Sequence, residues 1–190
     1  MAKLWEQTMI GEDSFHLMNL KHPRVDQEVM AEMEAGVDVY YDRRWGATAI
    51  LTDWFSKNID LFRDKKVLIL GAGVGAETLI LSKYAEHIWI NDLAPTAIDL
   101  CAEQLEKNQL TNYTALVGTY ETLDLPKVDL VVASFLIYND ETFTAMRDFL
   151  SQHQGKVILM NERLAPFPQF LKLEKHEIIF EIDGAVGVLL

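Results

Sequence analysis

Three glycines and one acid form the most informative pattern in this sequence. Gly71, Gly73 and Gly75 follow a continuous apolar run. Asp92 ends the next apolar run, about 20 residues later. Glycines at this spacing permit a tight turn, and a helix that opens beyond it offers unpaired N–H groups to a carboxylate or a phosphate. An acid at the end of the second strand can accept the hydroxyls of a ribose, so the pattern predicts a nucleotide cofactor site.

The glycine pattern fits two kinds of nucleotide cofactor. Gly71, Gly73 and Gly75 form a GxGxG loop, while Gly71, Gly73 and Ala76 form the GxGxxA of a dinucleotide site. Residues 1–64 precede the glycine strand, whereas many dinucleotide-binding domains begin close to their first strand. The chain of 190 residues is also short for the separate substrate domain of a hydride-transferring enzyme. Both features favour a methyl donor over NAD(P).

Apolar periodicity places these residues in an alternation of strands and helices. Strands are expected at 65–70, 87–91, 114–117, 128–133 and 156–161, and helices at 75–84, 94–108 and 142–151. Short connections between such elements imply right-handed βαβ units. The expected fold class is therefore α/β, a Rossmann-like, mostly parallel sheet with helices on both faces.

The N-terminal part of the chain shows weaker patterns. Residues 15–20 alternate well enough for a short strand or an irregular segment. Helices are expected at 26–35 and at 47–57, because apolar residues recur there at helical spacing. We expect one domain overall, with residues 1–40 as an extension packed on a domain of residues 41–190.

The C-terminal part predicts a hairpin. Asp183 and Gly184 separate two β-prone runs at 177–182 and 185–190. An Asp-Gly pair between such runs is a strong hairpin signal. We therefore expect an antiparallel addition at the edge of the sheet.

Composition limits the classes of function. The chain is 49% hydrophobic and 24% charged, as is usual for a soluble globular protein. Its 29 acidic and 17 basic residues give a net charge of −12, and the basic residues form no cluster. A phosphate backbone is expected to be repelled. The expected partner is therefore a protein or small-molecule methyl acceptor and not a nucleic acid, while the oligomeric state is left open.

Other signals point to a reducing compartment and give no sign of a metal or a membrane. Cys101 is the single cysteine, so a cytoplasmic location is expected. No apolar run approaches the roughly 18 residues of a membrane span. The N-terminus lacks the apolar stretch of a signal peptide, and membrane binding is not expected. His16 and His22 have no neighbouring ligand pattern, so no metal site is expected.

Three segments of the sequence resemble a known family. WGATAIL at 45–51, VLILGAGVG at 67–75 and IWINDLAPTA at 88–97 resemble the seven-strand, class I methyltransferases that use S-adenosylmethionine. More narrowly, they are similar to the branch that includes protein lysine methyltransferases acting on an electron-transfer flavoprotein or on a ribosomal protein. The similarity covers roughly residues 40–135.

The resemblance implies a role for several residues. The glycine loop would pass under the methionine part of the cofactor, and Asp92 would hold the ribose. The stretch 118–121 would lie by the adenine, and residues 134–138 would face the transferring methyl group. The cofactor-binding residues implied in this way are Trp45, Gly71, Ala72, Gly73, Gly75, Asp92, Leu93, Tyr120, Glu121 and Ser134. The catalytic candidates, by position alone, are Tyr138, Asn139 and Asp140.

Two positions depart from the family pattern. Ile69 stands where these methyltransferases commonly carry an acid that helps bind the methionine end of the cofactor. Phe135 stands where lysine-modifying relatives usually carry an Asp. The best hypothesis is a methyltransferase that methylates a nitrogen of a protein side chain or a small molecule. The alternatives are an NAD(P)-dependent oxidoreductase and a catalytically inactive nucleotide-binding protein of the same fold.

Overall fold

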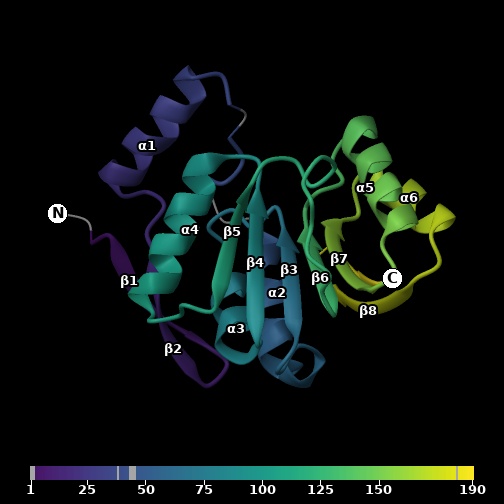
Figure 1. Ribbon diagram of the computed structural model, residues 1–190, viewed down its shortest axis with the longest axis horizontal. Helices are drawn as coiled ribbons and strands as arrows, with labels where there is room; N and C mark the ends of the chain where they lie inside the picture. The colour runs from purple at the N-terminus through teal and green to yellow at the C-terminus, as the bar shows by residue number, and fades with distance from the viewer. Residues whose placement is uncertain (1–2, 38, 43–45, 183) are drawn as a thin grey trace.

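A seven-stranded sheet runs through the centre of the molecule, with helices packed on it (Figure 1). The computed structural model describes residues 3–37, 39–42, 46–182 and 184–190. The parallel strands are β3 (Lys66–Leu70), β4 (His87–Asp92), β5 (Tyr113–Val117), β6 (Leu130–Ser134) and β7 (Lys156–Glu162). The C-terminal hairpin consists of β8 (Glu177–Ile182) and β9 (Ala185–Leu189). The expected α/β fold with an antiparallel hairpin is therefore confirmed.

The strand order reverses beside β3, the first strand of the glycine motif. The order is β5-β4-β3-β6-β7-β9-β8, and β9 runs antiparallel to both of its neighbours. From β3 the chain moves outward through β4 and β5, then returns to β6 on the other side of β3. Open α/β sheets bind ligands at the carboxyl ends of the strands that flank such a reversal. The expected ligand position lies between the ends of β3 and β6.

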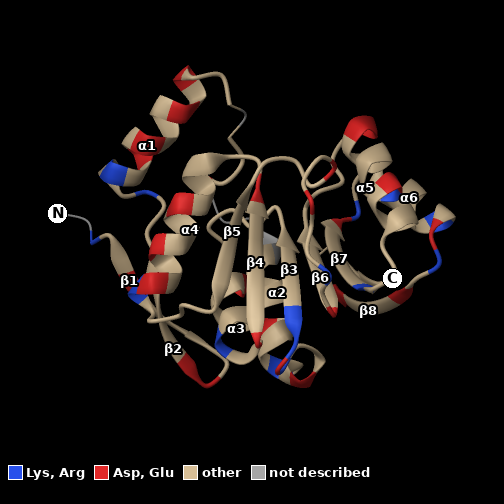
Figure 2. Ribbon diagram, in the orientation of Figure 1, with Lys and Arg blue, Asp and Glu red and all other residues tan. Residues whose placement is uncertain are grey.

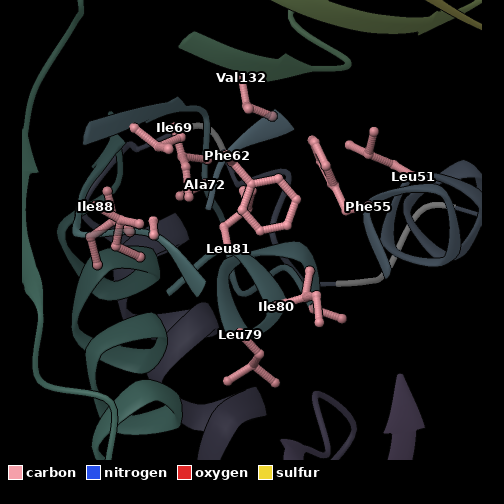
Figure 3. Packing of buried hydrophobic residues seen from close by; sticks show 14 of the residues in the cluster. Leu51, Phe55, Phe62, Ile69, Ala72, Leu79, Ile80, Leu81, Ile88 and Val132 are labelled. Atoms are coloured by element: carbon pink, nitrogen blue, oxygen red, sulfur yellow. The ribbon is translucent and has the colours of Figure 1, made fainter. Parts of the chain in front are cut away.

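Three helices cover one face of the sheet. They are α2 (Gly46–Lys57), α3 (Glu77–Tyr84) and α4 (Pro95–Lys107), and a 3-10 turn, η1 (Ile59–Leu61), follows α2. Phe55 of α2 and Phe62 after η1 pack edge to face, with their ring centroids 5.5 Å apart (Figure 3). Ile69 of β3 is buried in the same apolar cluster. The isoleucine at this position is therefore part of the core under α2 and α3.

Two helices cover the opposite face. They are α5 (Asp140–Gln152) and α6 (Phe167–Leu173). Because successive strand residues point to opposite faces, Leu68 and Leu70 of β3 belong to this second cluster together with Phe167 and Phe170. The burial of β3 on both faces confirms its expected place at the centre of the sheet.

The N-terminal segment folds beside α4. It consists of a two-stranded antiparallel sheet, β1 (Trp5–Ile10) and β2 (Asp13–Met18), and of helix α1 (Pro23–Glu34). Gln104 of α4 and Asn108, which follows the helix, hold β2. Gln104 accepts a hydrogen bond from the N–H of Met18 at 2.9 Å, and Asn108 accepts one from the N–H of His16 at 2.7 Å. In the parts of the chain that the structure describes, no helix is long and apolar enough to cross a membrane.

Candidate functional site

The loop between β3 and α3 requires glycine at its first position. Gly71 has a φ of +62° and Gly73 a φ of +50°, left-handed values that favour glycine. A Cβ on Gly71 would lie 2.5 Å from Cδ2 of Leu136, in the segment that follows β6. The glycine loop and the segment after β6 therefore touch, at the edge of the sheet where the chain reverses.

Asp92 binds the glycine loop from the end of β4. One carboxylate oxygen, Oδ2, accepts a hydrogen bond from the N–H of Gly73 at 2.8 Å, and Oδ1 accepts one from the N–H of Ala94 at 3.0 Å. Burial raises the pKa of Asp92, and the charge of Glu32 raises it further, while the backbone N–H groups lower it. The sequence placed this acid correctly at the end of the second parallel strand, beside the loop.

The buried carboxylate of Glu77 was missed by the sequence reasoning. Glu77 is the first residue of α3 and is only 2% exposed. It accepts a hydrogen bond from Oγ of Ser134 at 3.4 Å, and a Cβ on Gly75 would collide with its carboxylate. The available signal was an acid in the first turn of the helix after the loop, where the helix dipole favours negative charge.

The segments after β4 and β5 hold the residues expected near the adenine. The side chain of Leu93 is exposed, and so is that of Glu121. Tyr120 is half-buried and packs edge to face on Phe149 of α5, with ring centroids 5.8 Å apart. Burial raises the pKa of Tyr120, followed by the effects of Glu121 and Tyr138. The ring contact with Phe149 therefore holds the segment after β5 against α5.

The segment after β6 has an unusual backbone conformation. Phe135 has a φ of +57°, which is uncommon for a residue with a side chain, and its N–H donates to the carbonyl of Met160 at 2.8 Å. Asn161 of β7 holds the same segment by donating from Nδ2 to the carbonyl of Ile137 at 2.7 Å. Two contacts with β7 thus fix the segment that was expected to face the methyl group.

The catalytic candidates lie at the start of α5. The side chain of Asn139 accepts a hydrogen bond from the N–H of Thr142 at 2.8 Å and so caps this helix. Asp140 is exposed in its first turn. Tyr138 is half-exposed and its ring centroid lies 5.5 Å from that of Tyr40. Figure 2 shows acidic residues at both the start of α5 and the end of β4, at one edge of the sheet.

Most of the predicted site residues lie at this edge. Gly73 and Asp92 are joined by a hydrogen bond, Gly71 lies against Leu136, and Ser134 donates to Glu77 of the helix after the loop. Trp45 lies outside the described residues. The assignment of these residues to a cofactor stays a prediction at this point.

Comparisons with known proteins give a consistent family. Residues 67–153 match the family model described as a methyltransferase domain. The human electron transfer flavoprotein beta subunit lysine methyltransferase is 31% identical over 117 residues, which cover 60% of this chain and 44% of that protein. The "Probable ribosomal RNA small subunit methyltransferase A" of Methanosphaera stadtmanae is 31% identical over 78 residues, which cover 41% of this chain and 29% of that protein. The chain thus spans less than half the length of these curated relatives.

A solved structure shares the whole fold. The 16S rRNA N2 G1207 methyltransferase of T. thermophilus, in complex with AdoMet and guanosine, superposes with a TM-score of 0.65. It is 15% identical, and the match covers 99% of this chain and 50% of that one. At this identity the likeness establishes the fold alone.

The expectation that nucleic acid is excluded as a partner is wrong. A probable ribosomal RNA methyltransferase is among the relatives by sequence, and solved rRNA methyltransferases share the fold. The net charge of −12 is a sum over the chain, whereas attraction of a phosphate backbone depends on the charges of the face that meets it. Net charge therefore does not decide the class of acceptor.

The family match and the strand order agree with each other. The matched residues 67–153 begin at β3, contain the glycine loop and Asp92, and extend to the end of α5. The resemblance of the sequence to the class I, seven-strand methyltransferases is therefore confirmed.

Proposed function

We propose that the protein transfers the methyl group of S-adenosylmethionine to a nitrogen atom of an acceptor. The observation that carries this proposal is the contact of Asp92 with the glycine loop at the reversal of the strand order. The matched methyltransferase domain and the lysine methyltransferase among the relatives support it. None of the comparisons reported above supports an NAD(P)-dependent oxidoreductase.

The residues at the carboxyl edge of the sheet fit this cofactor. The loop at 71–75 would hold the methionine part, Asp92 would accept hydrogen bonds from the ribose hydroxyls, and Leu93, Tyr120 and Glu121 would lie by the adenine. When bound, S-adenosylmethionine supplies a methyl group already activated by its sulfonium. Little acid-base chemistry is then required of the protein, because placement of the acceptor in line with the methyl group supplies much of the rate.

The segment after β6 is best placed to position the acceptor. It contacts the glycine loop through Leu136 and is fixed by β7, so it has a defined place beside that loop. The half-exposed rings of Tyr138 and Tyr40 offer π faces on which a cationic side chain can lie. We therefore infer a nitrogen of a protein side chain as the acceptor. A cytoplasmic location belongs to the same proposal, supported by the buried free thiol of Cys101.

Calorimetric titration with S-adenosylhomocysteine tests the cofactor, and NADH serves as the competing ligand. We expect S-adenosylhomocysteine to bind with a micromolar dissociation constant and NADH to give no heat of binding. Transfer of labelled methyl groups to protein extracts and to total RNA then identifies the acceptor class. Label in RNA alone would overturn the protein acceptor. Binding without transfer to any acceptor pool would favour the inactive protein, and preference for NADH would overturn the proposal.

The Gly71→Ala variant is expected to lose affinity for S-adenosylhomocysteine by about tenfold or more. The left-handed conformation of a non-glycine residue costs about 1–2 kcal/mol, and the new Cβ would press on Leu136. Gly184→Ala is the matched control, because Gly184 has a φ of +83° and no heavy atom within 4 Å of an added Cβ. Both variants should lose stability in urea unfolding, and only Gly71→Ala should lose affinity. Equal affinity of the two variants would contradict the prediction.

A further inference from the structure

We propose that Glu32 and Tyr41 are positioning residues, through which helix α1 holds the glycine loop and the start of α4 in the geometry that binds the cofactor. The inference rests on the proposed function, since it assumes that Asp92 and the loop bind an adenosyl group. Neither residue stands out in the sequence, and neither belongs to the matched methyltransferase domain. The structure, however, joins both of them to the site by direct contacts.

Glu32 connects helix α1 with Tyr41 and with the start of α4. Its carboxylate is buried on α1, where Oε1 accepts a hydrogen bond from the N–H of Thr96 at 3.0 Å. Oε2 accepts the hydrogen of the Tyr41 hydroxyl. Thr96 lies in the first turn of α4, so one oxygen of Glu32 binds the start of that helix. The other oxygen fixes the tyrosine ring.

Tyr41 carries this contact to the glycine loop. Its side chain is buried in an apolar cluster with Val74 of the loop and Ala94 at the start of α4. A Cβ on Gly73 would be in van der Waals contact with Cβ of Tyr41, at 3.6 Å. The loop therefore lies directly against Tyr41 at the glycine whose N–H donates to Asp92.

These contacts support Asp92 from two sides. The two N–H groups that Asp92 accepts from belong to Gly73 and Ala94. Tyr41 packs against Gly73, and Glu32 binds Thr96 two residues beyond Ala94. Each arm of the Glu32 carboxylate thus supports one of the two groups that orient Asp92. Loss of either arm frees one side of the ribose-binding acid.

A buried carboxylate stabilises the packing of two helices less favourably than an apolar contact does, because its charge must lose water. Burial of a charge is unfavourable unless hydrogen bonds compensate for it, and an apolar contact would attach α1 at lower cost. The same pair of helices has a second polar link on its surface, where Nη1 of Arg24 donates to Glu103 of α4 at 2.8 Å. Figure 1 shows α1 and α4 at the same end of the sheet. Attachment of α1 alone therefore does not explain why Glu32 is buried between Thr96 and Tyr41.

The Arg24–Glu103 link supplies the matched control. Tyr41→Phe removes one hydroxyl, Glu32→Gln removes one buried charge, and Glu103→Gln removes one charge from the other contact between α1 and α4. Calorimetric titration with S-adenosylhomocysteine is expected to show about tenfold weaker binding for Tyr41→Phe and for Glu32→Gln. Glu103→Gln should bind within twofold of the wild type. The double variant should lose no more affinity than the product of the two single fold-losses, because both residues act through one network.

The pH dependence of binding separates this role from a merely structural one. Among the described residues, the titratable groups that act on Asp92 or are acted on by it are Glu32, Tyr41 and Cys101. Burial raises the pKa of Tyr41 and raises that of Cys101 to about 12, so neither is charged in acid. Without the negative charge of Glu32 the pKa of Asp92 falls, and Asp92 stays ionised at lower pH. The acid limb of binding should move to lower pH in Glu32→Gln and stay in place in Glu103→Gln.

The outcomes distinguish the inference from the function on which it rests. If the wild type does not bind S-adenosylhomocysteine, the proposed function fails. If the wild type binds and Tyr41→Phe and Glu32→Gln bind within twofold of it, with unchanged pH profiles, the positioning role is overturned. Should Glu32→Gln fail to fold, Tyr41→Phe decides the matter, because removal of one hydroxyl leaves the ring in the apolar cluster.

Discussion

The Asp92→Ala variant is expected to bind S-adenosylhomocysteine more than about a hundredfold more weakly than the wild type. Hydrogen bonds to a charged group are worth about 1.5–3 kcal/mol each, so the loss of two ribose contacts exceeds two factors of ten. The variant also releases the N–H groups of Gly73 and Ala94, which the carboxylate accepts at 2.8 and 3.0 Å. Calorimetric titration measures the affinity, and thermal unfolding shows whether the variant is folded.

Two further substitutions control for charge and shape. Asp99→Ala removes an exposed acid from α4 and should leave the affinity within twofold of the wild type. Asp92→Asn keeps the shape of the side chain and one acceptor oxygen, so its affinity should fall between those of the wild type and Asp92→Ala. A folded Asp92→Ala protein with unchanged affinity would remove Asp92 from the cofactor site.

The Phe62→Ala variant is expected to lose about 3–5 kcal/mol of unfolding free energy. Phe62 is fully buried in the apolar cluster that α2 and β3 share. Its ring packs edge to face on that of Phe55 (Figure 3). Truncation would leave a cavity in a part of the molecule where helices and strands enclose the ring from several sides. Urea unfolding followed by circular dichroism measures the difference.

An exposed leucine provides the comparison for this variant. Leu164 is 64% exposed, so Leu164→Ala should change the unfolding free energy by less than about 0.5 kcal/mol. A loss below about 1 kcal/mol in Phe62→Ala would show that the core closes around the missing ring.

The parallel part of the fold could be predicted because its signals are local. β3, β4 and β6 are apolar runs that a helical pattern follows, and the observed bounds of β3 and α3 differ from the expected ones by one or two residues. β1 was not predicted, because only Ile10 of its six residues is buried and no alternating pattern results. α6 was missed because it is short and contains Pro168 near its start. The division of the chain at residue 40 stays a prediction.

The candidate site could likewise be predicted only where its contacts are local in the sequence. The glycine loop and Asp92 are adjacent elements of one motif, so their contact could be expected from spacing. Glu32 meets the N–H of Thr96 across 64 residues of sequence, and no local pattern indicates such a contact. The error about nucleic acid has a related cause, because composition does not record where charges lie in space.

The position of β9 has a consequence for the order in which the protein is assembled. β9 follows β8 in the sequence but lies between β7 and β8 in the sheet. During synthesis β8 leaves the ribosome first and has no partner strand until β9 emerges, while β7 keeps an open edge. Unpaired edges of this kind favour pairing between different chains. The sheet can therefore be completed only after β9 has left the exit tunnel and has paired with both β7 and β8.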